Sequence, residues 1–168
     1  VNVNKGNVSA DNDEQDLKQY SQAISDFGRQ FLKSYLPIQF NENTQVNALQ
    51  TERQEKLAPY VTSDILATLS KVQQDTHNIA LKDIYVHDVQ ANGDTYLITY
   101  KINMLLSTNP FSKTILKDDK TDKSKVEIVK NNKTVYMTVK VFHQEDEDRF
   151  VVYELPSFEA VEGNEQSI

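Results

Sequence analysis

The spacing of apolar residues changes once along this chain, from a helical period in the first half to a strand period in the second. Residues 17–36 place apolar side chains at steps of three and four, which is typical of an amphipathic helix. From residue 79 onward, long runs show the alternation of β-strands. Helices followed by consecutive strands predict an α+β fold in which helices pack on one face of an antiparallel sheet.

Three helices are expected in the first half. The first, over the segment just described, ends at Pro37 and would be roughly 30 Å long, enough to lie across a whole sheet. A second helix with few apolar residues is expected over 46–57, and Pro59 breaks it. Thr62 or Ser63 can cap a third helix. Its inward-facing residues would be Ile65, Leu66, Leu69 and Val72.

The first two strands of the second half are expected to form a hairpin. The first strand begins at Ile79, and the segment 91–94 turns the chain because its Asn92-Gly93 pair supplies the positive φ that tight hairpins need. The second strand covers 95–107. Apolar residues stand on both of its faces, so we expect at least part of it to be covered on both sides.

Two further strands are expected to complete the sheet. The third covers about 126–142, and residues 131–133 (Asn-Asn-Lys) either divide it into two short strands joined by a turn or form a bulge within it. An acidic turn over 144–148 follows. The last strand covers 150–155 and ends at Pro156.

This element order predicts a nuclear-transport-factor-like cone, also called cystatin-like, in which N-terminal helices pack on a curved antiparallel sheet of about four strands. The long first helix of such a cone lies in the hollow of the sheet, where Phe27, Phe31 and Tyr35 would fill the space. A simpler helix-plus-meander domain without a cone is the alternative.

The ends of the chain differ in composition from its middle. Residues 1–16 are polar and predict a flexible lead-in, residues 17–158 form the single domain, and residues 159–168 predict a disordered acidic tail. Because the sequence begins at Val1 rather than at Met, we expect it to be part of a longer protein whose upstream part could hold a membrane anchor.

Composition excludes several classes of chemistry. The net charge is −7, which argues against direct nucleic-acid binding because phosphate neutralisation needs clustered Lys and Arg. The chain has no cysteine, so disulfides, zinc–thiolate sites and thiol catalysis are all excluded. Its four glycines form no phosphate-binding loop, and no nucleophile elbow is present. We therefore expect no cofactor.

Ionisable residues that could line the hollow are the candidates for catalysis. Cone folds can host a carboxylate base beside a tyrosine. Here the candidates are Asp83, Asp88, Tyr85, Tyr96 and Tyr100, although the tyrosines equally suit core or cross-strand packing.

The three histidines, which are His77, His87 and His143, show no metal-ligand spacing, and His87 and Asp88 point to opposite faces of a strand. We assign no catalytic, cofactor-binding or metal-binding residue.

Charge is segregated along the second half. Residues 111–133 carry seven lysines against four acidic residues, whereas residues 144–168 carry eight acidic residues against Arg149. Such segregation can steer an oppositely charged partner or a second copy of the chain, or both segments can simply be solvated loops. The run 145–148 lacks the spacing of a calcium loop, so we interpret it as a solvated hairpin turn.

A series of segments rich in aromatic and apolar positions runs through about residues 17–158. They are Phe27-Gly28-Arg29-Gln30-Phe31-Leu32-Lys33-Ser34-Tyr35, Arg53, Leu57-Ala58-Pro59-Tyr60, Tyr96-Leu97-Ile98-Thr99-Tyr100 and Val151-Val152-Tyr153-Glu154-Leu155-Pro156. In this series the chain resembles the TcpC-type conjugative transfer proteins of Gram-positive plasmids and transposons.

The resemblance implies a nuclear-transport-factor-like, non-enzymatic scaffold domain of a conjugative type IV secretion channel, similar to the periplasmic domains of VirB-type scaffold proteins. Such proteins have one membrane span, and their folded domains lie outside the cell membrane. The implied partners are other conjugation-channel proteins and further copies of the chain in a homo-oligomer. TcpC-like chains carry two such domains in tandem, whereas this sequence holds one. The rivals are a small-ligand-binding or catalytic cone and an extracellular lipoprotein domain unrelated to conjugation.

Overall fold

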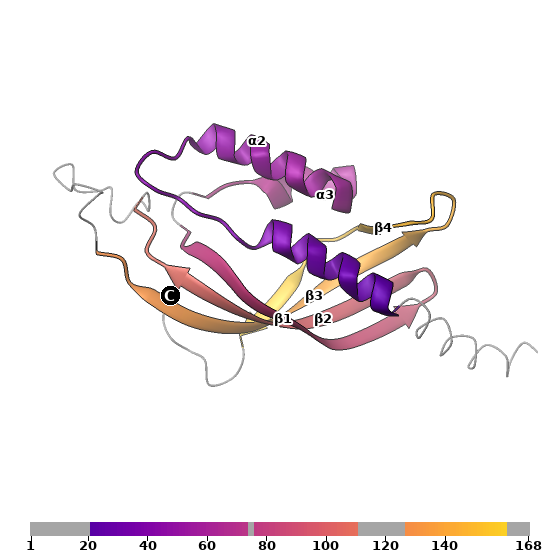
Figure 1. The fold of residues 1–168 in the computed structure, drawn as a ribbon. Helices are drawn as coiled ribbons and strands as arrows, with labels where there is room; N and C mark the ends of the chain where they lie inside the picture. The colour runs from indigo at the N-terminus through magenta and orange to yellow at the C-terminus, as the bar shows by residue number, and fades with distance from the viewer. Residues whose placement is uncertain (1–20, 74–75, 111–126, 161–168) are drawn as a thin grey trace, which may run out of the picture.

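The structure is a computed structural model that describes residues 21–73, 76–110 and 127–160. Helices lie together on one side of a curved antiparallel sheet, and the N-terminal helix (residues 21–35) runs along the concave face (Figure 1). The lead-in over 1–16, most of the lysine-rich segment and the residues after 160 lie outside the described residues. The predicted layers, with helices packed on a curved sheet, are confirmed.

The helices follow the local signals in the sequence. The N-terminal helix continues to residue 35, just before Pro37. α2 (Val46–Leu57) ends in a short 3₁₀-helix, η1 (Ala58–Tyr60), that contains the expected proline. α3 (Ser63–Ser70) begins after Thr62, whose backbone is extended as at an N-cap, although its side chain makes no capping hydrogen bond.

The sheet has five strands rather than about four. They are β1 (Asn78–Asn92), β2 (Thr95–Ser107), β3 (Lys130–Gln144), β4 (Arg149–Val152) and β5 (Ser157–Ala160). The order is β1-β2-β3-β4, and β5 pairs with β3 antiparallel beyond β4. β2 and β3 stay in unbroken register over their whole shared length, which makes them the centre of the sheet.

Three details of the strands correct the sequence predictions. β3 passes through Asn131-Asn132-Lys133 without a break or a bulge, because these residues pair in register with Leu106, Leu105 and Met104 of β2. β2 buries alternate residues only, so it is covered on one face, and the apolar residues of its other face are half-exposed. Pro156 does not end the sheet, because the chain leaves β4 at Val152 and resumes pairing at Ser157.

Two bulges in β1 bend the first hairpin, and a two-residue turn connects its strands. The β1–β2 register shifts at two places, once between Leu81 and Asp83 and once between Val86 and Asp88, and such bulges bend a strand. The two-residue turn is Gly93-Asp94, with φ of +66° at Gly93. Glycine at the first central position is the residue that a type II′ hairpin turn favours.

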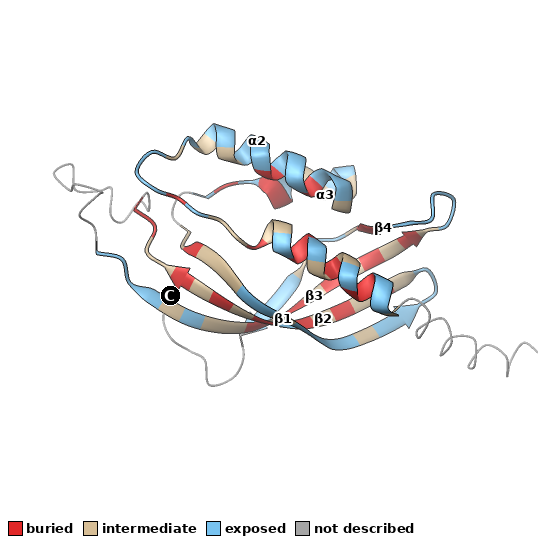
Figure 2. Ribbon diagram, viewed as in Figure 1, coloured by how far each residue is buried: buried red, intermediate tan, exposed pale blue. Residues whose placement is uncertain are grey.

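The core lies between the N-terminal helix and the concave face of the sheet (Figure 2). Phe31 is fully buried as predicted, whereas Phe27 and Tyr35 are partly exposed and pack at the margin of the core. Among the described residues the fully buried strand residues include Ile98 and Tyr100 of β2.

Backbone hydrogen bonds just after the helix also hold it in place. Ile38 forms a two-bond bridge with Ile79, which joins the chain after the helix to the start of β1.

Candidate functional site

The hollow beneath the N-terminal helix is filled by side chains. Tyr100 crosses the space from β2 and donates a hydrogen bond of 2.8 Å from its hydroxyl to the backbone oxygen of Ser25. Gly28 lies directly over the tyrosine ring, and a Cβ at this position would stand 2.9 Å from Tyr100 Cζ. Burial raises the pKa of the Tyr100 hydroxyl, so this group stays neutral at physiological pH. Where Gly28 meets Tyr100, the hollow leaves no room for a ligand.

The candidate catalytic residues do not converge. Asp83 and Asp88 are exposed on β1, and Asp88 accepts a hydrogen bond from Gln90, its neighbour on the same strand. Tyr85 is 52% exposed, whereas Tyr96 is buried with Tyr100 in the core. The structure therefore brings none of the candidate carboxylates into the hollow beside a tyrosine.

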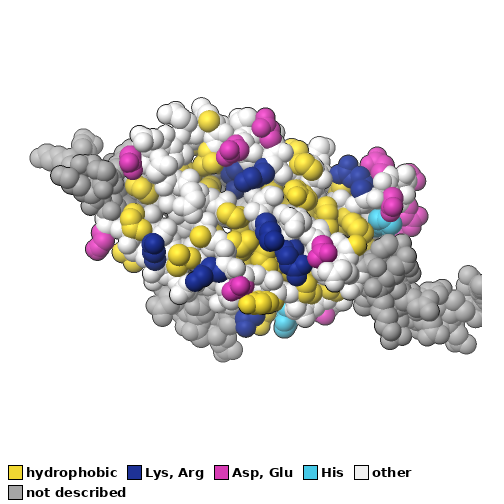
Figure 3. Space-filling model, in the orientation of Figure 1, with side chains coloured by type: hydrophobic (Ala, Val, Ile, Leu, Met, Phe, Trp, Pro, Cys, Tyr) yellow, Lys and Arg dark blue, Asp and Glu magenta, His cyan; other side chains and the backbone are white. Residues whose placement is uncertain are grey.

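The histidines are also separate from one another. The exposed His87 ring contacts Tyr136, with ring centroids 4.8 Å apart. His143 is buried, and its Nε2 lies 3.1 Å from Asp148 Oδ1 in the acidic turn. Among the described residues, no three His, Asp or Glu side chains form a group that could hold a metal ion. The turn over 145–148 lies at one end of the molecule, where acidic side chains gather in Figure 3.

Beyond the end of the N-terminal helix, the hollow is open. A cavity of about 730 Å³ lies between this end, α3 and the strands β2, β3 and β5. Its apolar lining includes Tyr35, Leu36, Leu69, Met104, Leu106, Val135, Met137 and Phe158. Its charged lining consists of Arg53, Lys71 and Lys133, and none of the described residues that line it is acidic. An apolar floor with a cationic margin suits a ligand that is itself apolar and negatively charged.

Arg53 joins this cavity to the fold. Its guanidinium is buried and donates from Nη2 to the Tyr35 backbone oxygen at 3.0 Å and from Nη1 to the Pro37 oxygen at 3.4 Å. Because Tyr35 is the last residue of the helix, Arg53 satisfies carbonyl groups at the negative end of the helix dipole. Burial lowers the pKa of Arg53, and the opposing effect of Tyr35 is smaller. Its Nε is buried without a hydrogen-bond partner among the described residues.

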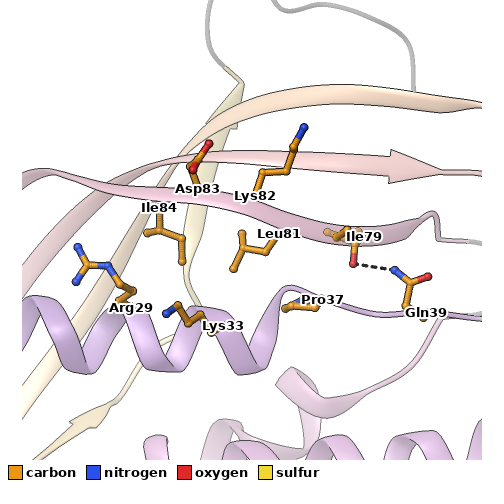
Figure 4. Close-up of a pocket in the computed structure, with 10 residues that line it drawn as sticks. Arg29, Lys33, Pro37, Gln39, Ile79, Leu81, Lys82, Asp83 and Ile84 are labelled. Atoms are coloured by element: carbon orange, nitrogen blue, oxygen red, sulfur yellow. Dashed lines mark hydrogen bonds between the residues drawn. The ribbon is translucent and has the colours of Figure 1, made fainter.

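A second groove, of about 640 Å³, runs between the N-terminal helix and β1 (Figure 4). Leu81 and Ile84 point toward the helix, whereas Lys82 and Asp83 point away from it. Arg29 lines the groove but is paired with Asp26 of the same helix at 2.9 Å. The charged lining of the groove has both signs, since Lys33 and Lys82 stand with Asp83, so the groove selects for the charge of a ligand less clearly than the cavity does.

Sequence reasoning missed two features of the open cavity. Arg53 belongs to the series of positions that carries the resemblance, but nothing in its polar surroundings on α2 indicates burial against the end of another helix. The sequence predicts that the domain ends at Phe158, whereas this residue lies on β5 and is 67% exposed beside the cavity. The alternating Ser157-Phe158-Glu159-Ala160 pattern was the available signal.

Comparison with known proteins identifies the relatives of this fold. Residues 27–168 match the family described as conjugative transposon protein TcpC. No curated protein matches the sequence of this chain.

Among solved structures, an Ntf2-like protein involved in plasmid conjugation superposes with a TM-score of 0.59 at 13% identity, covering 84% of this chain and 49% of that one. This chain thus spans about half the length of that relative. The Ntf2-like, potential transfer protein TraM from the Gram-positive conjugative plasmid pIP501 has a TM-score of 0.53 at 18% identity, covering 86% and 99%.

The intermembrane space region of the chloroplast protein ARC6 has a TM-score of 0.53 at 12% identity, covering 83% of this chain and 96% of that one. At these identities the likeness shows the fold alone. The predicted nuclear-transport-factor-like fold is thereby confirmed, with a sheet that does not close among the described residues.

Proposed function

The chain belongs to the family of the conjugative transposon protein TcpC, and from this membership we propose that it is a scaffold domain of a Gram-positive conjugative type IV secretion channel. The domain acts through protein–protein contacts and performs no chemistry of its own. Its partners are other channel proteins, and further copies of the chain can join the same assembly. It contacts no nucleic acid directly.

One observation carries this proposal: the hollow is closed by packing beneath the helix, and its open half contains no acidic side chain among the described lining residues. An enzyme of this fold would need a proton acceptor where a substrate can reach it. Tyr100 is buried and bonded to the helix backbone, and burial raises the pKa of Tyr35, the tyrosine that lines the open half. The exposed surfaces of the domain are therefore left to perform the function.

We place the domain on the extracellular side of the cell membrane, where a scaffold of this type meets its partners. Among the described residues, no helix combines the length and the apolar character that crossing a membrane requires. In this proposal, a membrane anchor elsewhere in the full-length protein holds the domain at the membrane.

Transfer frequency in donor cells tests the role. Deleting the gene should abolish conjugation, and supplying the full-length protein in trans should restore it. Cross-linking in the same cells should join the protein to other channel components. Normal transfer by the deletion strain would refute the proposal.

The absence of cysteine from the 168 residues allows a direct test of location. Tyr85→Cys introduces a thiol at an exposed position of β1. In a full-length protein without other cysteines, a membrane-impermeant maleimide should label this thiol in intact cells. Labelling only after lysis would place the domain on the cytoplasmic side of the membrane and contradict the proposal.

A further inference from the structure

The strand β5 leaves an open edge beside the cavity. Among the described residues β5 pairs only with β3, whereas β4 is covered on its outer side by a bridge from Val61 and by the hydrogen bond from the Thr62 N–H to the Val152 oxygen. Phe158 of β5 pairs in register with Met137, so it stands on the concave face. An unpaired strand edge next to an exposed aromatic side chain can accept an added strand.

The floor of the cavity is adaptable. The chain has two methionines, Met104 and Met137, and both line this cavity from adjacent strands. Methionine side chains are flexible and polarizable, and surfaces that bind apolar side chains of varied shape often use them. Phe158 extends the floor to the sheet edge, where an aromatic side chain in a protein interface commonly contributes much of the binding energy.

The charged residues that line the cavity in the described part of the chain are all basic. Lys71 follows α3, Lys133 pairs with Met104 and so stands on the concave face of β3, and Arg53 has a buried Nε without a partner among the described residues. Glu159 neighbours Phe158 but pairs with Tyr136, so it stands on the opposite face of the sheet. This arrangement favours an occupant with a carboxylate close to its apolar group.

We propose that the open end of the hollow, formed by Phe158, Met104, Met137, Lys71, Lys133 and Arg53, binds an extended, acidic and apolar segment of a partner protein. This inference rests on the proposed scaffold function and names the chemistry of its partner. The segment adds a strand to the β5 edge and inserts a large apolar side chain into the cavity. A neighbouring carboxylate of the segment meets the lysines.

Two alternatives fit the structure less well. A small amphipathic anion needs a pocket that encloses most of its surface, and this cavity opens toward an unpaired strand edge. Strand addition at β1 is disfavoured because two bulges interrupt the β1 backbone, and bulges are a common protection of sheet edges.

The test measures binding of the 168-residue chain to overlapping synthetic peptides of about 12 residues that cover the other transfer proteins encoded with it. We expect bound peptides to carry an acidic residue within a few positions of a large apolar one. Phe158→Ala should weaken binding at least about tenfold, and the Lys71→Glu/Lys133→Glu double variant should do the same. Matched controls are Tyr85→Ala and Lys101→Glu, exposed positions away from the cavity, which should leave affinity unchanged.

Three results would overturn the inference. They are the absence of any bound peptide, peptide binding that Phe158→Ala does not weaken, and displacement of the peptide by dodecanoate bound with equal or higher affinity, which would assign the cavity to a small amphiphile. The transfer frequency in donor cells shows whether the binding site alone is wrong or the scaffold role as well. If deletion of the gene abolishes transfer but Phe158→Ala with both lysine reversals transfers normally, the scaffold role stands and the binding site is wrong.

Discussion

Gly28 is the position at which a single methyl group should most clearly disturb this fold. The residue lies in the middle of the N-terminal helix, and the Tyr100 ring passes directly beneath it. A Cβ there would stand 2.9 Å from Tyr100 Cζ and closer still to the hydroxyl oxygen. Gly28→Ala therefore forces either the helix or the tyrosine to move, and the tyrosine is fixed by its hydrogen bond to Ser25.

Opposing effects set the size of the change in the free energy of unfolding that Gly28→Ala causes. Replacing glycine by alanine in a helix interior normally stabilises by about 1 kcal/mol. Overpacking a closely packed core costs about 1–3 kcal/mol, and loss of the Tyr100–Ser25 hydrogen bond costs about 1 kcal/mol more. The net expectation is a destabilisation of about 2 kcal/mol, because the steric and hydrogen-bond costs together exceed the gain in helix propensity.

Urea unfolding followed by circular dichroism measures this change, and a double-mutant cycle locates its cause. In a Tyr100→Phe background the hydroxyl is gone, so Gly28→Ala should cost at least about 1 kcal/mol less than in the parent chain. Gln30→Gly, at an exposed position of the same helix, gives the propensity difference without a clash. If Gly28→Ala stabilises the protein, or if its cost is the same in both backgrounds, the close contact does not constrain the fold as argued.

Three further predictions concern the buried polar groups of Arg53, Asn78 and Tyr100. Arg53→Met removes the donors to the Tyr35 and Pro37 oxygens and should lower the free energy of unfolding by about 2 kcal/mol in urea titrations; an unchanged midpoint would mean that burial of the guanidinium cancels its bonds. Asn78→Ala removes both side-chain hydrogen bonds to the Phe40 backbone, so stability should fall by about 2 kcal/mol and the Phe40 amide should exchange faster. Burial raises the pKa of the Tyr100 hydroxyl above its ordinary value of 10.0. As the pH rises above about 10, the unfolded chain therefore loses the hydroxyl proton before the folded chain does, and the free energy of unfolding should fall. Tyr100→Phe should reduce this fall, which urea midpoints measured across the pH range would show.

Local signals explain why the helices and the first hairpin were predictable. Proline stops a helix through its own ring, and glycine permits a positive φ through its missing side chain, so neither effect depends on distant residues. Pro37 therefore marked the end of the first helix, and Gly93 marked the first hairpin. The boundaries of α2 and β2 match the predicted ranges for the same reason.

Long-range pairing explains what the sequence did not reveal. Asn131-Asn132-Lys133 is a typical turn sequence, yet these residues stay in a strand because the end of β2 offers them hydrogen-bond partners. β5 has only four residues and follows a proline, so it exists as a strand only because β3 extends past the end of β4. Arg53 is similar, since its burial depends on the arrival of carbonyl groups from another helix.

The open cavity itself follows from the unequal rise of helix and strand. The described N-terminal helix, residues 21–35, advances about 1.5 Å per residue and so spans about 22 Å. β2 has 13 residues at about 3.3 Å each and therefore extends about 43 Å. Gly28 meets the sheet at Tyr100, so the helix ends while β2 still continues through Met104 and Leu106.

The concave surface beyond the end of the helix must be covered by something else, and within the described residues the short α3 covers it only in part. Pro37 fixes where the helix ends, and the unbroken register of β2 with β3 fixes how far the sheet continues. The same two features that define the fold therefore leave an apolar surface exposed beside β5. In the described part of the chain no further element covers this surface, and it is here that we propose a partner segment adds to the sheet edge.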